Sequence, residues 1–496
     1  MGTTTMRRPR PHAGPSPGRR RRGRMLLAHE IRALLRLAGP IIVGQLGAVA
    51  MTTTDTIMVA PLGPASLAAA GLASGLHFAS LVTFSGILMG MTPLVAQSFG
   101  AGDREACRRV AVQGLWLAIL VSIPVTALSL AGGPVARWLG QDPEVARLAG
   151  RFMVALAPGV LPLMLFGAFR QYLDGMGRTR VAMTILFVGV ALNVIGNRVL
   201  IHGVPGVVAP LGVVGSGLST SFVRCAMLAA MAAYVARHPE LSPFRGVSLR
   251  PVPARMRAIA AIGAPIGMQL GAEIGCFSFA AVMMGWMGPV QLASHQVTIN
   301  IASSTFMVAV GASAAGGIRV GHHLGAGSRR GVRRAALGTY AVALGFMSAC
   351  ALAFLLVPRQ LIGLYTSDPG IVAVGTSLLF MAALFQVFDG AQVTALSLLR
   401  GAADTRVPMW ITILGYWGVG IPVGYVLGFH TPLRHVGVWS GLTISLAVVG
   451  ITLMWRVRRV LWSPTLAAVA ARPSPAETEI AGAEMAAQVA APVAGD

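Results

Sequence analysis

Residues 34–59 read LLRLAGPIIVGQLGAVAMTTTDTIMV. The run is long enough to cross a bilayer as a helix, because about twenty apolar residues span a hydrocarbon core of roughly 30 Å. It also carries a carboxylate, Asp55, although a charged side chain is costly inside a bilayer. The segment therefore predicts a membrane helix that holds a functional acid between the two membrane surfaces.

Similar apolar runs recur along most of the chain. Its 496 residues are 55% hydrophobic and only 11% charged, whereas a soluble domain usually carries about 25% charged residues. The further runs predict spans near 66–93, 110–131, 149–169, 181–201, 211–236, 257–286, 290–317, 335–357, 371–398, 407–429 and 436–456. The expected fold class is therefore an all-α polytopic membrane protein with twelve transmembrane helices.

The two halves of the chain repeat each other at a nearly constant offset. The matching features are Pro40 and Pro265, Gly63-Pro64 and Gly288-Pro289, residues 100–102 and 325–327, all 225 apart, and Thr179-Arg180 and Thr405-Arg406, 226 apart. A constant offset over several loops is hard to obtain by chance. Each repeat holds six spans, an even number, so we expect two parallel-repeat six-helix lobes around a central cavity.

The repeat divides the chain into two lobes with a tail at each end. We expect the first lobe at 31–238 and the second at 257–460, joined by a cytoplasmic linker at 239–256. Residues 1–30 are rich in Arg, and residues 461–496 are rich in Ala and Pro. Such compositions cannot bury a core, so we expect both tails to be disordered.

The formal net charge of +23 comes from arginines that gather in connectors. Connectors after even-numbered spans are basic, and those after odd-numbered spans hold few arginines. Positively charged loops stay in the cytoplasm, so both termini are expected there, in a multi-pass protein of the bacterial inner membrane. We expect a monomer whose partner is the lipid bilayer. No nucleic-acid interface is expected, because no separate basic domain lies outside the tail.

Three of the sixteen acidic residues fall inside predicted spans: Asp55, Glu273 and Asp389. An intramembrane carboxylate is by default a candidate functional residue, because hydrocarbon makes it expensive to keep. The alternative is a buried acid that only joins helices by hydrogen bonds. We favour the functional interpretation, because all three acids have polar neighbours in the sequence.

Polar side chains from several spans accompany Asp55. Gln45 lies roughly along the same face of the first span, and Asn193 and Asn197 share a face of the fifth. Together with the hydroxyl of Thr220, these oxygens are the ligands that a small cation needs. The asparagines could equally serve as hydrogen-bonding glue between helices, and both interpretations stay open.

A second polar set accompanies Glu273 and Asp389. Amide side chains lie about one turn from each acid and on the eighth span, at Gln269, Gln296, Asn300, Gln386 and Gln392. This set is expected to hold a cation or a proton in the second lobe. His295, in the same region, is interpreted as a packing residue.

Arg224 falls roughly midway through the sixth span, one turn from Thr220. A guanidinium at that depth cannot face lipid cheaply, so we expect it to point into the first lobe. There it would compensate the charge of Asp55 as a bound cation does.

Motifs of other protein classes are not legible in the sequence. It has no Walker loop for ATP, and its four cysteines are far apart, with no CxxC spacing. We therefore expect no cofactor beyond Na⁺ or H⁺ as a coupling ion. A membrane-embedded enzyme is the least favoured class, because no clustered nucleophile or metal site is visible.

Six segments resemble one known family. They are DTIMVAPLGPASLAA from Asp55, GMTPLVAQSFGAG from Gly90, DGMGRTRVAM from Asp174, HQVTIN from His295, IRVGHHLGAG from Ile318 and LLRGAADTRVP from Leu398. In combination they resemble the multidrug and toxic compound extrusion (MATE) transporters, in the NorM-like bacterial branch, from about residue 39 to 459. The resemblance implies secondary active efflux of small cationic, often aromatic, compounds in exchange for Na⁺ or H⁺.

The resemblance also implies roles for individual residues. Asp55 matches the acid of the first helix, with Asn193 and Asn197 as the polar pair of the fifth, and Na⁺ could bind there or at Glu273 and Asp389. The residues expected to bind the coupling ion are Asp55, Asn193, Asn197, Thr220, Glu273 and Asp389. Those expected to line the substrate cavity are Gln45, Gln269, Gln296, Asn300, Phe385 and Gln392.

Two residues depart from the family pattern. Some relatives carry Asp where this chain has Asn197, and many carry Tyr where it has Phe385. A flippase of a related two-lobe fold, moving lipid-linked oligosaccharide, is the alternative function. It would favour a more cationic cavity, whereas here the acids inside spans outnumber the arginines, Arg198 and Arg224.

Overall fold

The computed structural model describes residues 17–206 and 209–463. The helices are α1 (Pro17–Val59), α2 (Pro64–Leu88), α3 (Met91–Gly100), α4 (Arg104–Leu130), α5 (Gly132–Trp138), α6 (Pro143–Leu156), α7 (Val160–Gly175), α8 (Thr179–His202), α9 (Val213–Arg237), α10 (Pro253–Met287), α11 (Pro289–Gly325), α12 (Arg329–Leu356), α13 (Pro358–Gly363), α14 (Pro369–Gly401), α15 (Arg406–Ile413), α16 (Ile421–Phe429) and α17 (Arg434–Leu461). Short 3₁₀ segments follow α1 and α6, and a π-helical segment, Leu414–Gly420, joins α15 to α16.

Twelve helical stretches within the described residues are long and apolar enough to cross a membrane. Each contains the core of one predicted span, so the prediction of twelve spans is confirmed. The helices extend past the apolar runs; α11, for example, continues to Gly325, beyond the predicted end at residue 317. A run of apolar residues shows only the part of a helix that lies within the bilayer. Backbone hydrogen bonds let the helix continue beyond the bilayer surface, so the helix is longer than the apolar run.

Two helices begin earlier than the predicted boundaries. The structure begins α1 at Pro17, so residues 17–30 are helical rather than disordered. Arginine favours helices, and proline is tolerated in a first turn. The expected linker also ends early, because α10 begins at Pro253. The remaining parts of the two expected tails, residues 1–16 and 464–496, lie outside the described residues.

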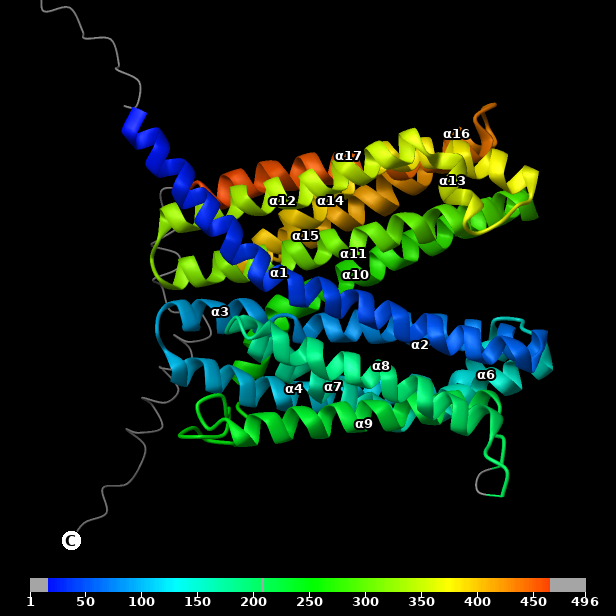
Figure 1. The fold of residues 1–496 in the computed structure, drawn as a ribbon, viewed down its shortest axis with the longest axis horizontal. Helices are drawn as coiled ribbons and strands as arrows, with labels where there is room; N and C mark the ends of the chain where they lie inside the picture. Colours follow the sequence, from blue (N-terminus) through cyan, green and yellow to red (C-terminus); the bar gives the residue numbers. More distant parts are fainter. Residues whose placement is uncertain (1–16, 207–208, 464–496) are drawn as a thin grey trace, which may run out of the picture.

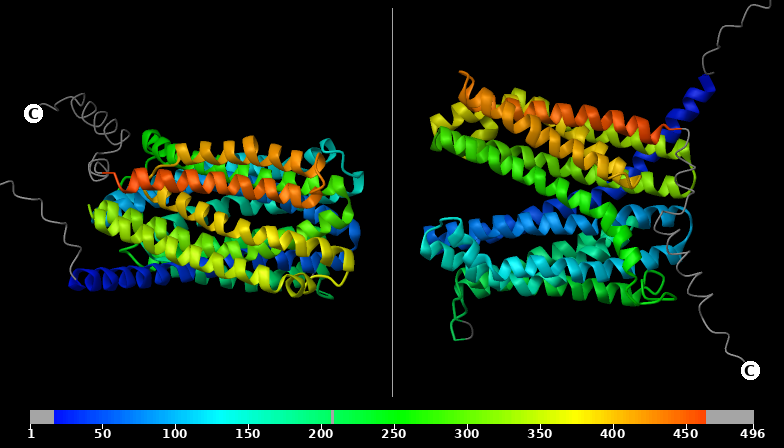
Figure 2. Two further views of the ribbon diagram at one scale, coloured as in Figure 1. Left: turned by 90° about the horizontal axis from the view of Figure 1, so that it is seen from above. Right: turned by 180° about the vertical axis from the view of Figure 1, so that it is seen from behind.

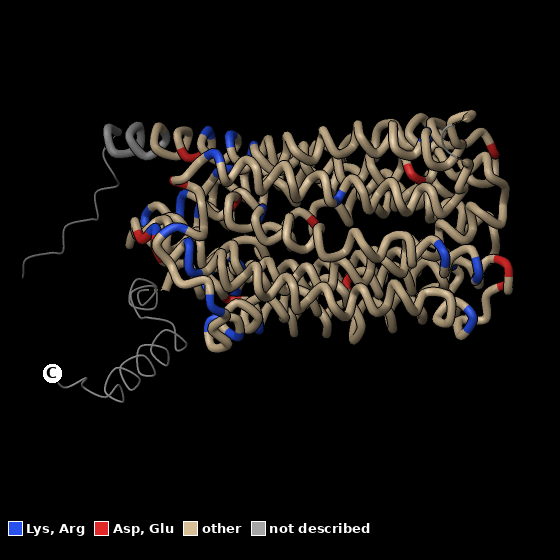
Figure 3. The backbone as a smooth tube through the Cα atoms, turned by 90° about the horizontal axis from the view of Figure 1, so that it is seen from below, with Lys and Arg blue, Asp and Glu red and all other residues tan. Residues whose placement is uncertain are grey.

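The helices form two bundles that lie side by side (Figure 1). The first lobe contains α1 to α9 and the second contains α10 to α17, with α1 crossing between them. The view from behind shows the bundles close together at one end and diverging toward the other (Figure 2, right). Most arginines gather at the end where the bundles meet, which we call the arginine-rich end (Figure 3).

The repeat is visible in how the lobes contact each other. Helix α1 packs on α11 and α2 packs on α10, two equivalent pairs. Gly86 lies against Gly267, and Gly311 lies against Ile42, so closely that neither Gly86 nor Gly311 leaves room for a Cβ. Residues 86 and 311, like 42 and 267, are 225 apart. The two crossings are therefore copies of one contact.

Hydrogen bonds between the lobes repeat in the same way. The side-chain amide of Gln97 donates to the Gly401 carbonyl at 2.9 Å, and His322 Nε2 donates to the Gly175 carbonyl at 2.7 Å. Gln97 and His322 are equivalent in the repeat, as are Gly175 and Gly401. Both bonds lie at the arginine-rich end, where they hold the lobes together.

Candidate functional site

The structure brings together four of the five polar residues that the sequence predicts for the site of the first lobe. Asp55 Oδ1 accepts a hydrogen bond from Asn197 Nδ2 at 2.6 Å, and Oδ2 accepts one from the Thr220 hydroxyl at 3.3 Å. Asn193 donates to Thr220 and accepts from Asn197, both at 3.3 Å. Helices α1, α8 and α9 thus converge on one carboxylate.

Asn197 presents the nitrogen of its side-chain amide, rather than the oxygen, to Asp55, and Asn193 presents its nitrogen to Thr220. Both are fully buried, and the Asn197 Oδ1 atom has no hydrogen-bond partner among the described residues. A sodium ion prefers oxygen ligands, so Asn197 would serve as a ligand only after its amide turned the oxygen toward the ion. In the arrangement observed, Asp55 is already satisfied by donors.

Arg224 points into the first lobe, where its partner is His77, a residue that no sequence pattern indicated. Arg224 Nη1 lies 3.1 Å from His77 Nε2, and His77 Nδ1 lies 3.2 Å from the Ser129 hydroxyl. Because a guanidinium can only donate, His77 Nε2 accepts and Nδ1 carries the proton. The charges of Arg224 and Asp55 interact, without a direct ion pair in the described part of the chain.

The two acids of the second lobe lie in different surroundings. Asp389, on α14, is only 5% exposed and has no hydrogen bond in the part of the chain described. Its charge interacts with that of Glu273 on α10, which in turn interacts with Arg400. Two carboxylates therefore share this region with one guanidinium, whereas in the first lobe one carboxylate faces one guanidinium.

Arg400 is part of the second-lobe site, although the sequence suggested a connector. It lies in the last turn of α14, and its Nη2 donates to Gln269 Oε1 at 3.1 Å. The Arg400 Nε and Gln269 Nε2 atoms are buried without partners among residues 17–206 and 209–463. The arginine therefore keeps donor capacity on the inside of the lobe.

Tyr416 supplies an oxygen that no sequence pattern indicated. Gln392 Nε2 donates to the Tyr416 hydroxyl at 2.6 Å, in the π-helical segment between α15 and α16. Phe385, where relatives carry Tyr, instead packs on Phe277 and Trp439, with ring centroids 6.0 and 5.8 Å apart. The aromatic residues form one buried wall beside the acids.

Three predicted cavity residues do not join these clusters. Gln45 accepts from Arg170 at 3.2 Å, and Arg170 also pairs with Asp174 at 3.4 Å. Gln296 and Asn300 are exposed on α11. Periodicity identifies the face of a helix, but it cannot tell which neighbour that face meets.

His295 and Gln386, also in the second lobe, contact residues other than the two acids. His295 is buried, and its Nδ1 accepts from the Trp439 indole at 3.2 Å, as expected of a packing residue. Gln386 donates to Thr305 rather than to Asp389.

Two repeated helical lobes, each with polar groups buried at the depth of its spans, define a membrane transporter of the repeat class. A family model described as MatE matches residues 40–199 and 265–426, once in each lobe. The chain belongs to this family, that of the MATE transporters.

Similar proteins cover nearly the same length. One from Mesorhizobium japonicum, named "Probable multidrug resistance protein NorM", is 38% identical over 89% of this chain and 97% of its own. One of the same name from Pseudomonas putida is 36% identical over 87% and 96%.

Solved structures share the fold. The eukaryotic MATE transporter AtDTX14 superposes with a TM-score of 0.81 at 20% identity, covering 90% of this chain and 98% of that one. The Vibrio cholerae MATE transporter VcmN in its bent form gives 0.79 at 18% identity, over 89% and 99%.

Proposed function

We propose that this chain exports small organic cations from the bacterial cytoplasm in exchange for Na⁺ or H⁺. Relatives of similar length bear the name of a multidrug resistance protein, which supports export of foreign compounds. The observation that carries the proposal is that Asp389 is buried without a hydrogen-bond donor among the described residues. Its charge interacts with that of Glu273, and Glu273 interacts in turn with Arg400; both of these residues are half-buried.

The charge balance favours a cationic cargo in the second lobe. With both acids ionised, the site has one uncompensated negative charge, which a cation or a proton neutralises. Exchange follows if the organic cation and the coupling ion compete for this charge. The aromatic wall of Phe277, Phe385 and Tyr416 suits the apolar part of an aromatic cargo.

The first lobe has no such excess, because Arg224 balances Asp55. We infer that this cluster positions helices α1, α8 and α9 and contributes less to ion coupling than the second lobe does.

In the proposed transport cycle, the binding site opens alternately to the two sides of the membrane. The arginine-rich end is the cytoplasmic one by the charge rule for loops. The named contacts between the lobes lie toward that end, which supports assigning this arrangement of the lobes to a state closed to the cytoplasm. Polar residues at the other half of α1 and α11, such as Thr53, Thr56 and Gln296, are exposed and would face outside water.

Transport into vesicles with imposed gradients tests the proposal. Purified protein should move an ethidium-like dye when a Na⁺ or a proton gradient is imposed, and Glu273→Gln should lose that response. Glu144→Gln is the matched control, because Glu144 is exposed and its one ion pair among the described residues is with Arg147 at 3.9 Å. Equal dye transport by wild type and Glu273→Gln, or no transport under either gradient, would contradict the proposal.

A further inference from the structure

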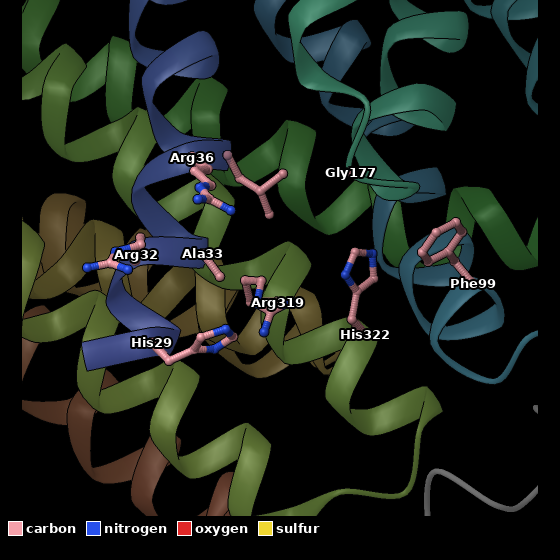
Figure 4. Close-up of a pocket in the computed structure, with 9 residues that line it drawn as sticks. His29, Arg32, Ala33, Arg36, Phe99, Gly177, Arg319 and His322 are labelled. Atoms are coloured by element: carbon pink, nitrogen blue, oxygen red, sulfur yellow. The ribbon is translucent and has the colours of Figure 1, made fainter. Parts of the chain in front are cut away.

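A basic pocket lies at the arginine-rich end, away from both acid clusters. Its volume is about 420 Å³, and its charged or aromatic walls include His29, Arg32, Arg36, Phe99, Arg319 and His322. Figure 4 shows α1 on one side of the pocket and Phe99 and Gly177 on the other, with Arg319 and His322 of α11 between them. The pocket is therefore built from both lobes.

The sequence of α1 explains why one of its faces is basic. His29, Arg32 and Arg36 are spaced i, i+3 and i+7, so they form a stripe along one face of the helix. Leu34 and Ala38 lie on another face and are buried against α11. Packing thus turns the apolar face toward the second lobe and leaves the basic stripe on the pocket.

The pocket has more positive charge than its neighbours balance. Arg319 is neutralised by Glu30, with two hydrogen bonds of 2.8 Å. Arg32 and Arg36 are exposed and have neither a hydrogen bond nor an ion pair among the residues that the structure describes. Two planar guanidinium groups are therefore free to bind a ligand from outside the chain.

The free arginines identify the chemistry of that ligand. One guanidinium group can donate two parallel hydrogen bonds to two phosphate oxygens. Basic pockets between membrane helices also suit the phosphate-bearing headgroups of lipids. The uncharged run of α1 begins at Leu37, which also lines the pocket, so the two arginines lie where the hydrocarbon core begins. A phospholipid can place its headgroup at this level with its chains still in the bilayer.

We propose that this pocket binds the phosphate of an anionic phospholipid, held by Arg32 and Arg36. Because α1 belongs to the first lobe and α11 to the second, separation of the lobes at this end would divide the pocket. Arg319 and His322 of the second lobe complete the pocket only when the lobes meet at this end. A lipid that contacts these walls as well as α1 favours the closed state, since a ligand stabilises the state that it binds better.

Native mass spectrometry of the full chain in detergent tests the site. Wild type should retain added phosphatidylglycerol about tenfold more tightly than the Arg32→Gln/Arg36→Gln double variant. Phosphatidylcholine should bind both proteins weakly. The matched control is Arg329→Gln/Arg330→Gln, which removes the same charge from two exposed residues at the same end but outside the pocket. It should retain phosphatidylglycerol as wild type does.

A second experiment adds inorganic phosphate as a competitor, because the free ion offers the same oxygens as the phosphate of the lipid. Phosphate at millimolar concentration should displace little phosphatidylglycerol. If phosphate alone saturates the site and the lipid shows no preference for wild type over the double variant, the lipid is the wrong source. Equal lipid loss in the pocket and control variants would overturn the site itself. Both variants must elute as the wild type does and bind dye, so that unfolding is not mistaken for lipid loss.

Discussion

The two lobes keep the same scaffold but hold their acids in opposite surroundings. Asp55 accepts hydrogen bonds from Asn197 and Thr220 and faces Arg224, whereas Asp389 has no such donor in the described residues. The acids are not copies of each other, because the residue 225 positions after Asp55 is Ala280. The two halves thus share the close glycine contacts and the hydrogen bonds between the lobes, whereas the buried acids and their partners differ.

This difference indicates a division of labour between the lobes. A carboxylate that is saturated by fixed donors and a fixed cation gains little from binding a further ion. Two carboxylates that share one guanidinium gain more, because one negative charge stays uncompensated. We therefore expect cation exchange at Glu273 and Asp389, and structural support at Asp55.

The largest effect is expected from neutralising Asp389. Asp389→Asn should reduce dye efflux from cells at least about tenfold, because an amide cannot balance an organic cation or carry a proton. Efflux is measured by dye accumulation in a host that lacks other pumps, with expression checked by immunoblot. Asp368→Asn is the control, since Asp368 only caps α14 and asparagine caps as well. Near wild-type efflux by Asp389→Asn would remove the second lobe from the mechanism.

A smaller, diagnostic effect is expected from Arg224. Arg224→Gln removes the fixed cation from the first lobe, so sodium should stimulate transport where it did not before. The measurement is dye transport in vesicles at a series of sodium concentrations. Arg198→Gln, at an exposed arginine of α8, serves for comparison. An unchanged sodium response in Arg224→Gln would mean that Arg224 does not substitute for a bound ion.

The repeated hydrogen bonds between the lobes should give equal and modest effects. Gln97→Ala and His322→Ala each remove one bond worth roughly 1 kcal/mol, which shifts the balance toward separated lobes about fivefold. Distances between spin labels at Arg180→Cys and Arg330→Cys, one on each lobe, report that shift. Widening in only one of the two variants would show that the equivalent bonds no longer act equivalently.

The smallest effect on transport is expected from the two cysteine variants that report the orientation of the chain in the membrane. In a background without the four native cysteines, Ser242→Cys and Ser328→Cys should transport normally and react with impermeant reagents only from the cytoplasmic side. Labelling from outside intact cells would reverse the orientation and the direction of transport.

Much of the fold could be predicted from the sequence because it depends on composition along the chain. Twelve spans follow from apolar runs, and the two lobes follow from the 225-residue offset. The cluster around Asp55 was also predictable, since Asn193 and Asn197 lie one turn apart on one helix and need a buried partner.

Contacts between distant helices were not predictable in the same way. His77 is a lone histidine in an apolar helix, and nothing local links it to Arg224. Arg400 resembled a topology signal, because its helix ends one residue later, yet its side chain turns back to Gln269. Tyr416 depends on a π-helical segment that no periodicity indicates. Each case is set by packing between helices far apart in sequence.

Binding of a monovalent organic dye to Asp55→Asn and Asp389→Asn, measured side by side in detergent, tests the division of labour most directly. Asp389→Asn should bind the dye at least about tenfold more weakly than wild type does, a loss of about 1.4 kcal/mol. Asp55→Asn should stay within about threefold of wild type, because Asp55 is balanced within its own lobe. Equal losses of dye binding in the two variants, or a larger loss in Asp55→Asn, would contradict the division of labour between the lobes.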